Sequence, residues 1–88
     1  MTRIIFSGIR TTTGALEISG IKSFEDFVST ISVEYPEIYS QIRNVRDGID
    51  LNFTALFKNG SRISKESIKS MIINENDVIA VVRAIAGG

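Results

Sequence analysis

A single long amphipathic stripe does most to constrain the fold of this chain. Between Ser23 and Tyr35, apolar side chains recur at the spacing of one helix face, at Phe24, Phe27, Val28, Ile31 and Tyr35. Ser23 supplies an N-cap with an acidic residue three positions later, and Pro36 predicts that the helix ends at or just before Tyr35. Because strand-like patterns surround this one main helix, the sequence predicts an α+β fold in which it packs against a sheet.

Alternating apolar residues predict strands over residues 3–9, 15–19, 51–58, 61–63 and 78–83. The first and last of these have apolar residues on both faces, which predicts central positions in the sheet. The first two are expected to form a hairpin, and Asn59-Gly60 predicts a type I′ turn between the next pair. Short helical turns are expected near residues 38–42 and 64–71. Residues 1–83 are therefore expected to form one domain, followed by a flexible tail over residues 84–88.

The strand over residues 51–58 carries a specific expectation about its faces. Read with a period of two, it places alternate side chains on the core face, at Leu51, Phe53, Ala55 and Phe57. The same reading leaves Leu56 pointing outward, as a candidate docking contact together with Ile85, although packing is the simpler account of each.

The composition excludes several kinds of chemistry. The 88 residues include no Cys and no His, which removes disulfides, thiolate metal sites, cysteine nucleophiles and serine triads. Neither a metal site nor a bound cofactor is expected. Ten basic residues balance ten acidic ones, which argues against a nucleic-acid partner. The start resembles no secretory signal and the apolar run 78–82 is too short for a bilayer, so a cytoplasmic protein without membrane contact is expected.

Charged residues are abundant but have simple explanations. Pairs of carboxylates occur at Glu25/Asp26, Asp47/Asp50 and Glu75/Asp77. The first suits a helix cap and the others suit turns, and none has calcium-loop spacing. Acidic residues gather over 23–42 and basic residues at Lys58, Arg62, Lys65 and Lys69. Two solvated faces are the simpler interpretation, and a bipolar docking surface is the alternative.

The last five residues are the remaining distinctive feature, with the sequence Ala84, Ile85, Ala86, Gly87 and Gly88. Glycine has no Cβ, so a terminal pair makes a thin, extendable peptide that can enter a narrow channel. Its carboxylate is unhindered and can be presented to another enzyme. A frayed tail without a role is the simpler alternative.

Residues 76–88 resemble the ending of the small sulfur-carrier subunit of molybdopterin synthase, in the MoaD/ThiS family. That ending consists of a Gly-Asp turn, an apolar strand, often Pro-Pro, an apolar residue and Gly-Gly. Here Asn76 replaces the turn glycine and Arg83-Ala84 stands where Pro-Pro is common. The order of the predicted elements agrees over nearly the whole chain. The resemblance implies a ubiquitin-like β-grasp fold, with a mixed sheet of four to five strands whose first and last strands are adjacent and parallel.

The resemblance also implies a carrier rather than an enzyme. An E1-like adenylating enzyme would use ATP to activate the Gly88 carboxylate, and a sulfur donor would convert it to a thiocarboxylate. Gly88 would thus be the reactive site, and Gly87 would provide clearance. The tail would enter the large subunit of molybdopterin synthase and donate its sulfur to a pterin precursor. Residues Ala84, Ile85 and Ala86 would line the channel of that subunit.

Three alternatives use the same scaffold. The terminus would equally serve a carrier for thiamine synthesis or tRNA thiolation. It would also serve a protein modifier that forms amide bonds to lysines. Finally, a β-grasp interaction module with an inert tail would bind its partner without Gly87 and Gly88, because one fold hosts many functions.

Overall fold

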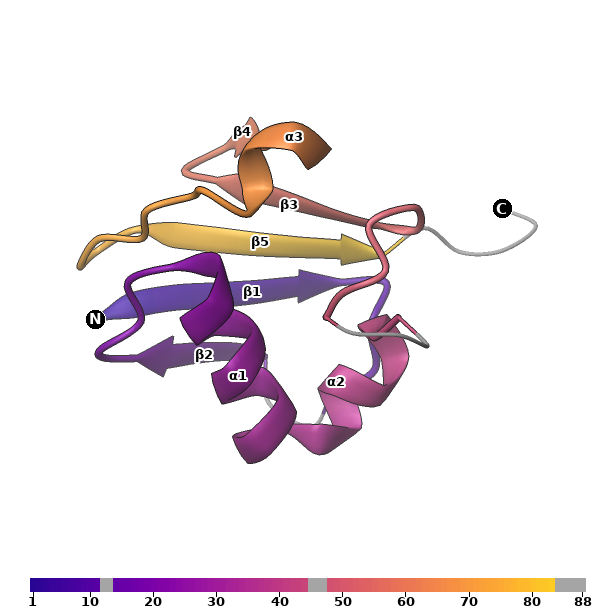
Figure 1. Cartoon of the computed structure of the whole chain (residues 1–88). Helices are drawn as coiled ribbons and strands as arrows, with labels where there is room; N and C mark the ends of the chain where they lie inside the picture. Colours follow the sequence, from indigo (N-terminus) through magenta and orange to yellow (C-terminus); the bar gives the residue numbers. More distant parts are fainter. Residues whose placement is uncertain (12–13, 45–47, 84–88) are drawn as a thin grey trace.

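The computed structural model describes residues 1–11, 14–44 and 48–83. In chain order its elements are β1 (Thr2–Ser7), β2 (Ala15–Ile18), α1 (Phe24–Glu34), α2 (Pro36–Ile42), β3 (Thr54–Lys58), β4 (Ser61–Arg62), α3 (Lys65–Ile68) and β5 (Val78–Arg83). The strands form one mixed sheet in the order β2-β1-β5-β3-β4, and α1 and α2 lie across one of its faces (Figure 1). This is the α+β arrangement that the sequence predicts.

The two strands predicted to be central are central. β1 and β5 run parallel, with Ile4 beside Ile79 and Phe6 beside Val81. β2 pairs antiparallel with β1 as the predicted hairpin, and β3 pairs antiparallel with β5. The first and last strands of the chain thus form the middle of the sheet, as the family resemblance implies.

The main helix begins and ends where its sequence predicts. Ser23 Oγ accepts a hydrogen bond from Asp26 N at 3.1 Å, which satisfies one free N–H group of the first turn. The Asp26 carboxylate accepts from Lys22 N at 3.0 Å, one residue earlier than in a capping box. Pro36 is the first residue of α2. A backbone N–H at this position has no partner within the helix, so proline costs no hydrogen bond there. The turn expected near residues 38–42 is therefore a seven-residue helix.

The core lies between the helices and one face of the sheet. Phe27 and Ile31 of α1 are fully buried. Ile38 and Ile42 of α2 are at most 3% exposed. Their counterparts on the sheet are Ile4, Leu16, Leu56, Ile79 and Val81. Short α3 adds Ile68, which is also buried, so the segment 64–71 contributes to the core although most of its residues are polar.

The predicted facing of the third strand is wrong. Leu56 is fully buried beside Val81 of β5, whereas Ala55 and Phe57 are half-buried on the opposite face and Phe53 is 56% exposed. The strand begins at Thr54, after a turn in which Thr54 N donates to the Asp50 carbonyl at 2.9 Å. Apolar residues occupy both faces of this strand, so alternation alone did not distinguish the core face. Leu56 is therefore excluded as a docking contact.

Two asparagines occupy backbone conformations that usually favour glycine. Asn59 and Gly60 have φ values of 51° and 87°, which confirms the predicted type I′ hairpin between β3 and β4. Asn76 stands where the molybdopterin synthase small subunit has a turn glycine, and its φ is 70°. Asparagine tolerates this left-handed region better than most residues, so the replacement keeps the turn before β5.

Candidate functional site

The residues predicted to carry the reaction, Gly88 with Ala84, Ile85, Ala86 and Gly87, lie outside the described residues. The structure therefore bears on the site through the base from which these residues continue. That base is the end of β5 at Arg83. Because β5 lies between β1 and β3, this base stands at the end of a strand in the middle of the sheet (Figure 1).

Two neighbouring segments define the end of β5. On one side Arg83 is the register partner of Thr54 at the start of β3. On the other side Gly8 follows β1 with φ of +75°, and a Cβ built there would clash with the Arg83 carbonyl oxygen. Gly8 thus allows the backbone after β1 to approach Arg83 closely. No motif in the sequence marks this glycine as functional, and its place directly after a central strand is the one signal that points to it.

The face of the sheet away from the helices carries a continuous apolar surface. Across the strands, Ile5 is level with Ala80 and Phe57, and Val82 is level with Ala55. Ile5 is 38% exposed and the other four side chains are half-buried. We call these five residues the open face. Two of them belong to β5, so the open face is continuous with the base of the tail.

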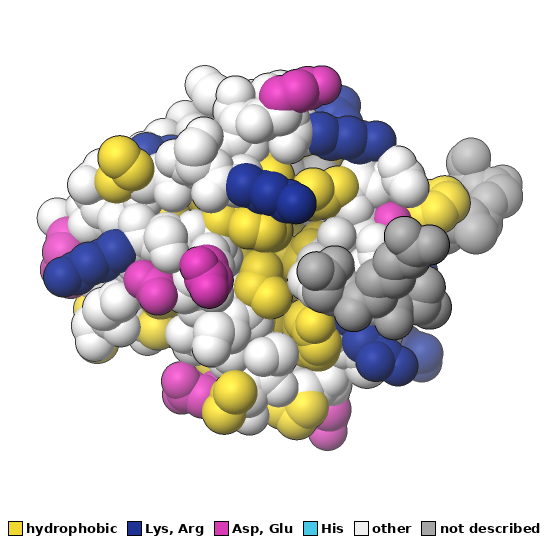
Figure 2. Space-filling model, viewed as in Figure 1, with side chains coloured by type: hydrophobic (Ala, Val, Ile, Leu, Met, Phe, Trp, Pro, Cys, Tyr) yellow, Lys and Arg dark blue, Asp and Glu magenta, His cyan; other side chains and the backbone are white. Residues whose placement is uncertain are grey.

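A second apolar surface lies on the helix side. Figure 2 shows hydrophobic side chains in a hollow in the middle of this side of the molecule. A groove of about 510 Å³ there is lined by Phe24, Val28, Ile49 and Leu51, with Lys69 at its edge. No residue of β5 lines this groove. The open face is therefore the surface more directly connected to the tail.

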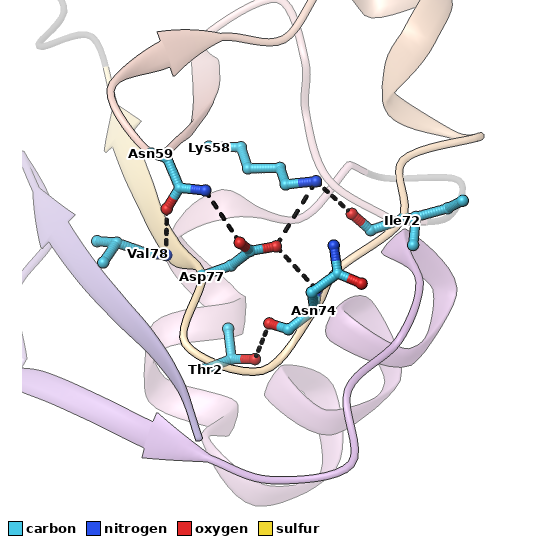
Figure 3. Close-up of polar contacts among 7 residues, drawn as sticks. All are labelled: Thr2, Lys58, Asn59, Ile72, Asn74, Asp77 and Val78. Atoms are coloured by element: carbon cyan, nitrogen blue, oxygen red, sulfur yellow. Dashed lines mark hydrogen bonds and ion pairs between the residues drawn. The ribbon is translucent and has the colours of Figure 1, made fainter.

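A polar cluster closes the other end of β5 (Figure 3). Asp77 is only 8% exposed, and its carboxylate accepts hydrogen bonds from Asn59 Nδ2 at 2.9 Å and Asn74 N at 2.8 Å. Lys58 Nζ lies 3.6 Å from the same carboxylate and donates to the Ile72 carbonyl at 2.7 Å. These contacts tie the β3–β4 hairpin to the turn before β5. The hydrogen bond from Asn59, with those from Asn74 and the charge of Lys58, holds the pKa of the Asp77 carboxyl below its ordinary value of 3.8.

The lowered pKa predicts a specific acid sensitivity. The unfolded chain binds a proton at Asp77 more readily than the folded chain, so this carboxylate stabilises the fold above pH 3.8. Its contribution is lost as the pH falls from that value through the lowered pKa. Urea unfolding across a pH series should show Asp77→Asn to be less stable than the natural chain near neutrality and the difference to shrink in acid. Glu75→Gln is the control, because Glu75 is exposed and pairs with the N-terminal amine. An equal acid response in all three chains would contradict the prediction.

The other predicted carboxylate pairs have structural roles. Asp26 caps α1, and Asp50 Oδ1 accepts from Asn52 N at 3.1 Å in the turn before β3, while Asp47 lies outside the described residues. Among the described residues no group of three or more acidic side chains is placed to hold a metal ion. The acidic residues of α1 and α2 are exposed, as are Arg62, Lys65 and Lys69, whereas Lys58 is engaged with Asp77. No helix in the described part of the chain is both long and apolar enough to cross a membrane.

Comparison with known proteins shows the family to which this scaffold belongs. The model of the ThiS family matches residues 4–88, which includes both glycines at the end of the chain. This protein belongs to the ThiS family. Neither the curated proteins nor the solved structures gave a match. The family match covers the sheet, the helices and the tail together.

Membership of the ThiS family establishes the general role. Proteins of this family are small ubiquitin-like sulfur carriers, and they work with E1-like activating enzymes and synthase partners. The five-stranded mixed sheet with α1 across it is the β-grasp fold of that family. Family membership does not separate carriers for molybdopterin from carriers for thiamine.

Proposed function

We propose that this ThiS family protein carries sulfur on Gly88 for the synthesis of molybdopterin. The observation that carries the proposal is the family match over residues 4–88, which extends through the terminal Gly87-Gly88. The ending from Asn76 to Gly88 favours the molybdopterin branch, because its turn, apolar strand and diglycine resemble the small subunit of molybdopterin synthase.

The proposed chemistry requires no catalytic side chain on this protein. A Gly88 carboxylate oxygen attacks the α-phosphorus of ATP on the E1-like enzyme, and pyrophosphate leaves. A donor at the oxidation level of sulfide then attacks the acyl carbon, and AMP departs with one of the original oxygens. The product is a thiocarboxylate on Gly88. Adenylation is needed because a carboxylate is a poor electrophile, whereas AMP is a good leaving group.

The open face is the proposed docking surface for the adenylating enzyme. Two of its residues, Ala80 and Val82, belong to β5, the strand that ends at the base of the tail, so an enzyme that covers them is already close to the residues it must bind. Half-buried apolar side chains in one continuous surface provide the kind of anchor that dominates protein interfaces. The helix-side groove lacks this connection, because none of its lining residues belongs to β5.

Ile5→Glu is expected to weaken binding to the adenylating enzyme by at least about tenfold, because it places a charge within the open face. The fold should persist, since Ile5 is 38% exposed and contributes little to the core. Val33→Glu is the matched control, because Val33 is also β-branched, is 75% exposed and lies on α1. Titration calorimetry should separate the two variants. Equal affinities would show that the open face is not the docking surface.

Intact mass spectrometry tests the proposed function. The protein is incubated with the adenylating enzyme of its host, ATP and a sulfur donor. A mass gain equal to the replacement of one oxygen by sulfur is expected. Addition of the large subunit of molybdopterin synthase and the pterin precursor should then return the original mass. No change in the presence of demonstrably active partners would contradict the carrier role.

The same samples distinguish the other roles. Retention of sulfur in the presence of the molybdopterin partners, with its loss to a thiamine or tRNA thiolation system, would redirect the proposal to that pathway. A ladder of covalent adducts on a denaturing gel would indicate a protein modifier. Binding of partners that survives removal of Gly87 and Gly88, without any mass change, would indicate an interaction module.

A further inference from the structure

A glutamine side chain ties α2 to the segment that follows β1. Gln41 Oε1 accepts a hydrogen bond from Arg10 N at 2.8 Å, and Gln41 Nε2 donates to the Arg10 carbonyl at 2.6 Å. The same nitrogen donates to the Glu37 carbonyl at 3.1 Å, so the amide is also held by its own helix. One side chain thus satisfies both backbone groups of Arg10. The pairing fixes the position of residues 8–10 relative to α2.

Residues 8–10 in turn lie beside the base of the tail. The last register pair between β1 and β5 joins Ser7 to Val82, so Gly8 comes next to Arg83. The approach is close enough that a Cβ on Gly8 would clash with the Arg83 carbonyl oxygen and lie 3.3 Å from its carbonyl carbon. A shift of residues 8–10 would therefore change the contact with the Arg83 carbonyl group at the end of β5.

We propose that Gln41 is a positioning residue for the activation of Gly88, acting through residues 8–10 on the direction in which the chain leaves β5. This inference rests on the proposed function. Five residues follow Arg83, and covalent geometry limits their reach to about 17 Å. A displacement of the Arg83 peptide group moves the point from which these five residues must reach the ATP α-phosphorus. In this scheme Gln41 acts through residues 8–10 and not on the nucleotide.

The test compares two variants of neighbouring residues in α2. Gln41→Leu keeps the approximate volume and removes all three hydrogen bonds. Ser40→Ala is the matched control, because it removes a side-chain hydrogen bond of 2.9 Å to the same Glu37 carbonyl without affecting residues 8–10. Pyrophosphate exchange with the cognate adenylating enzyme should show kcat lowered between about tenfold and a hundredfold for Gln41→Leu, with KM for the carrier unchanged. Ser40→Ala should match the natural chain, and both variants should unfold at similar temperatures.

Insertion of two glycines between Arg83 and Ala84 separates a directional effect from a structural one. The flexible insert uncouples the tail from its base, so the natural chain and Gln41→Leu are expected to react equally slowly once they carry it. A deficit of Gln41→Leu that persists in the inserted chains would overturn the inference, as would equal kcat values without the insert. Failure of the natural chain itself to be adenylated would instead count against the proposed function.

Discussion

A chain without Gly88 is expected to form no acyl-adenylate, while its thermal unfolding remains that of the full chain. The shortened chain still ends in a carboxylate, but that group lies about 3.5 Å nearer to β5. Reacting atoms must approach within about 3–3.5 Å, so a displacement of one residue removes the carboxylate from the ATP α-phosphorus. Stability should not change, because within the part of the chain that the structure describes the last residue of the buried apolar core is Val81.

Pyrophosphate exchange and intact mass measure this loss directly. Gly88→Ala is the matched control, since it keeps the length of the chain and adds only a Cβ. We expect this variant to be activated more slowly than the natural chain and faster than the deletion. The comparison separates the requirement for length from the requirement for clearance. Adenylation of the deleted chain at the natural rate would contradict the carrier mechanism proposed here.

Gly8→Ala is expected to lower the free energy of unfolding by about 2–5 kcal/mol. An L-residue with positive φ costs about 1–2 kcal/mol, and overpacking adds about 1–3 kcal/mol. The clash is with the backbone carbonyl of Arg83, which cannot rotate away as a long side chain does. Relief requires a shift of the backbone after β1 or at the end of β5. Such a loss is a large part of the stability of a small domain.

Two further glycines separate the causes of that loss in urea denaturation. Gly20 has φ of +83° but no atom within 4 Å of a built Cβ, so Gly20→Ala reports conformational strain without a clash. Gly14 has an unobstructed Cβ position, and no positive φ is recorded for it, so Gly14→Ala should be close to neutral. We expect destabilisation to increase from Gly14 through Gly20 to Gly8. Equal losses at Gly8 and Gly20 would show that the approach to Arg83 is unimportant.

Local signals in the sequence were sufficient for much of the fold. Ser23 and Pro36 mark the limits of α1 because capping and the absence of a proline N–H act within a few residues. The Asn59-Gly60 turn was predictable for the same reason. Central positions for β1 and β5 followed from apolar residues on both faces. Each of these features is determined by chemistry close in the chain.

Features that depend on distant parts of the chain were not predictable in this way. The facing of β3 was inverted because Leu56 and Phe57 are both apolar, and only pairing with β5 decides which is buried. The contact between Gly8 and Arg83 joins residues 75 positions apart, and the Gln41 pairing with Arg10 joins residues 31 apart. No local sequence pattern predicts such contacts. Family resemblance supplied the reactive Gly88, while the surroundings of the tail base came from the structure.

The position of β5 between β1 and β3 has a consequence for protein synthesis. Without β5, the sheet divides into two separate hairpins, β1–β2 and β3–β4, because only β5 joins them. Residues 78–83 must therefore leave the ribosome before the sheet can close, and this pairing of distant segments is inherently slow. A nascent chain that ends before β5 has no closed sheet to display to an activating enzyme. Assembly of the open face across β1, β5 and β3 therefore waits for the synthesis of β5.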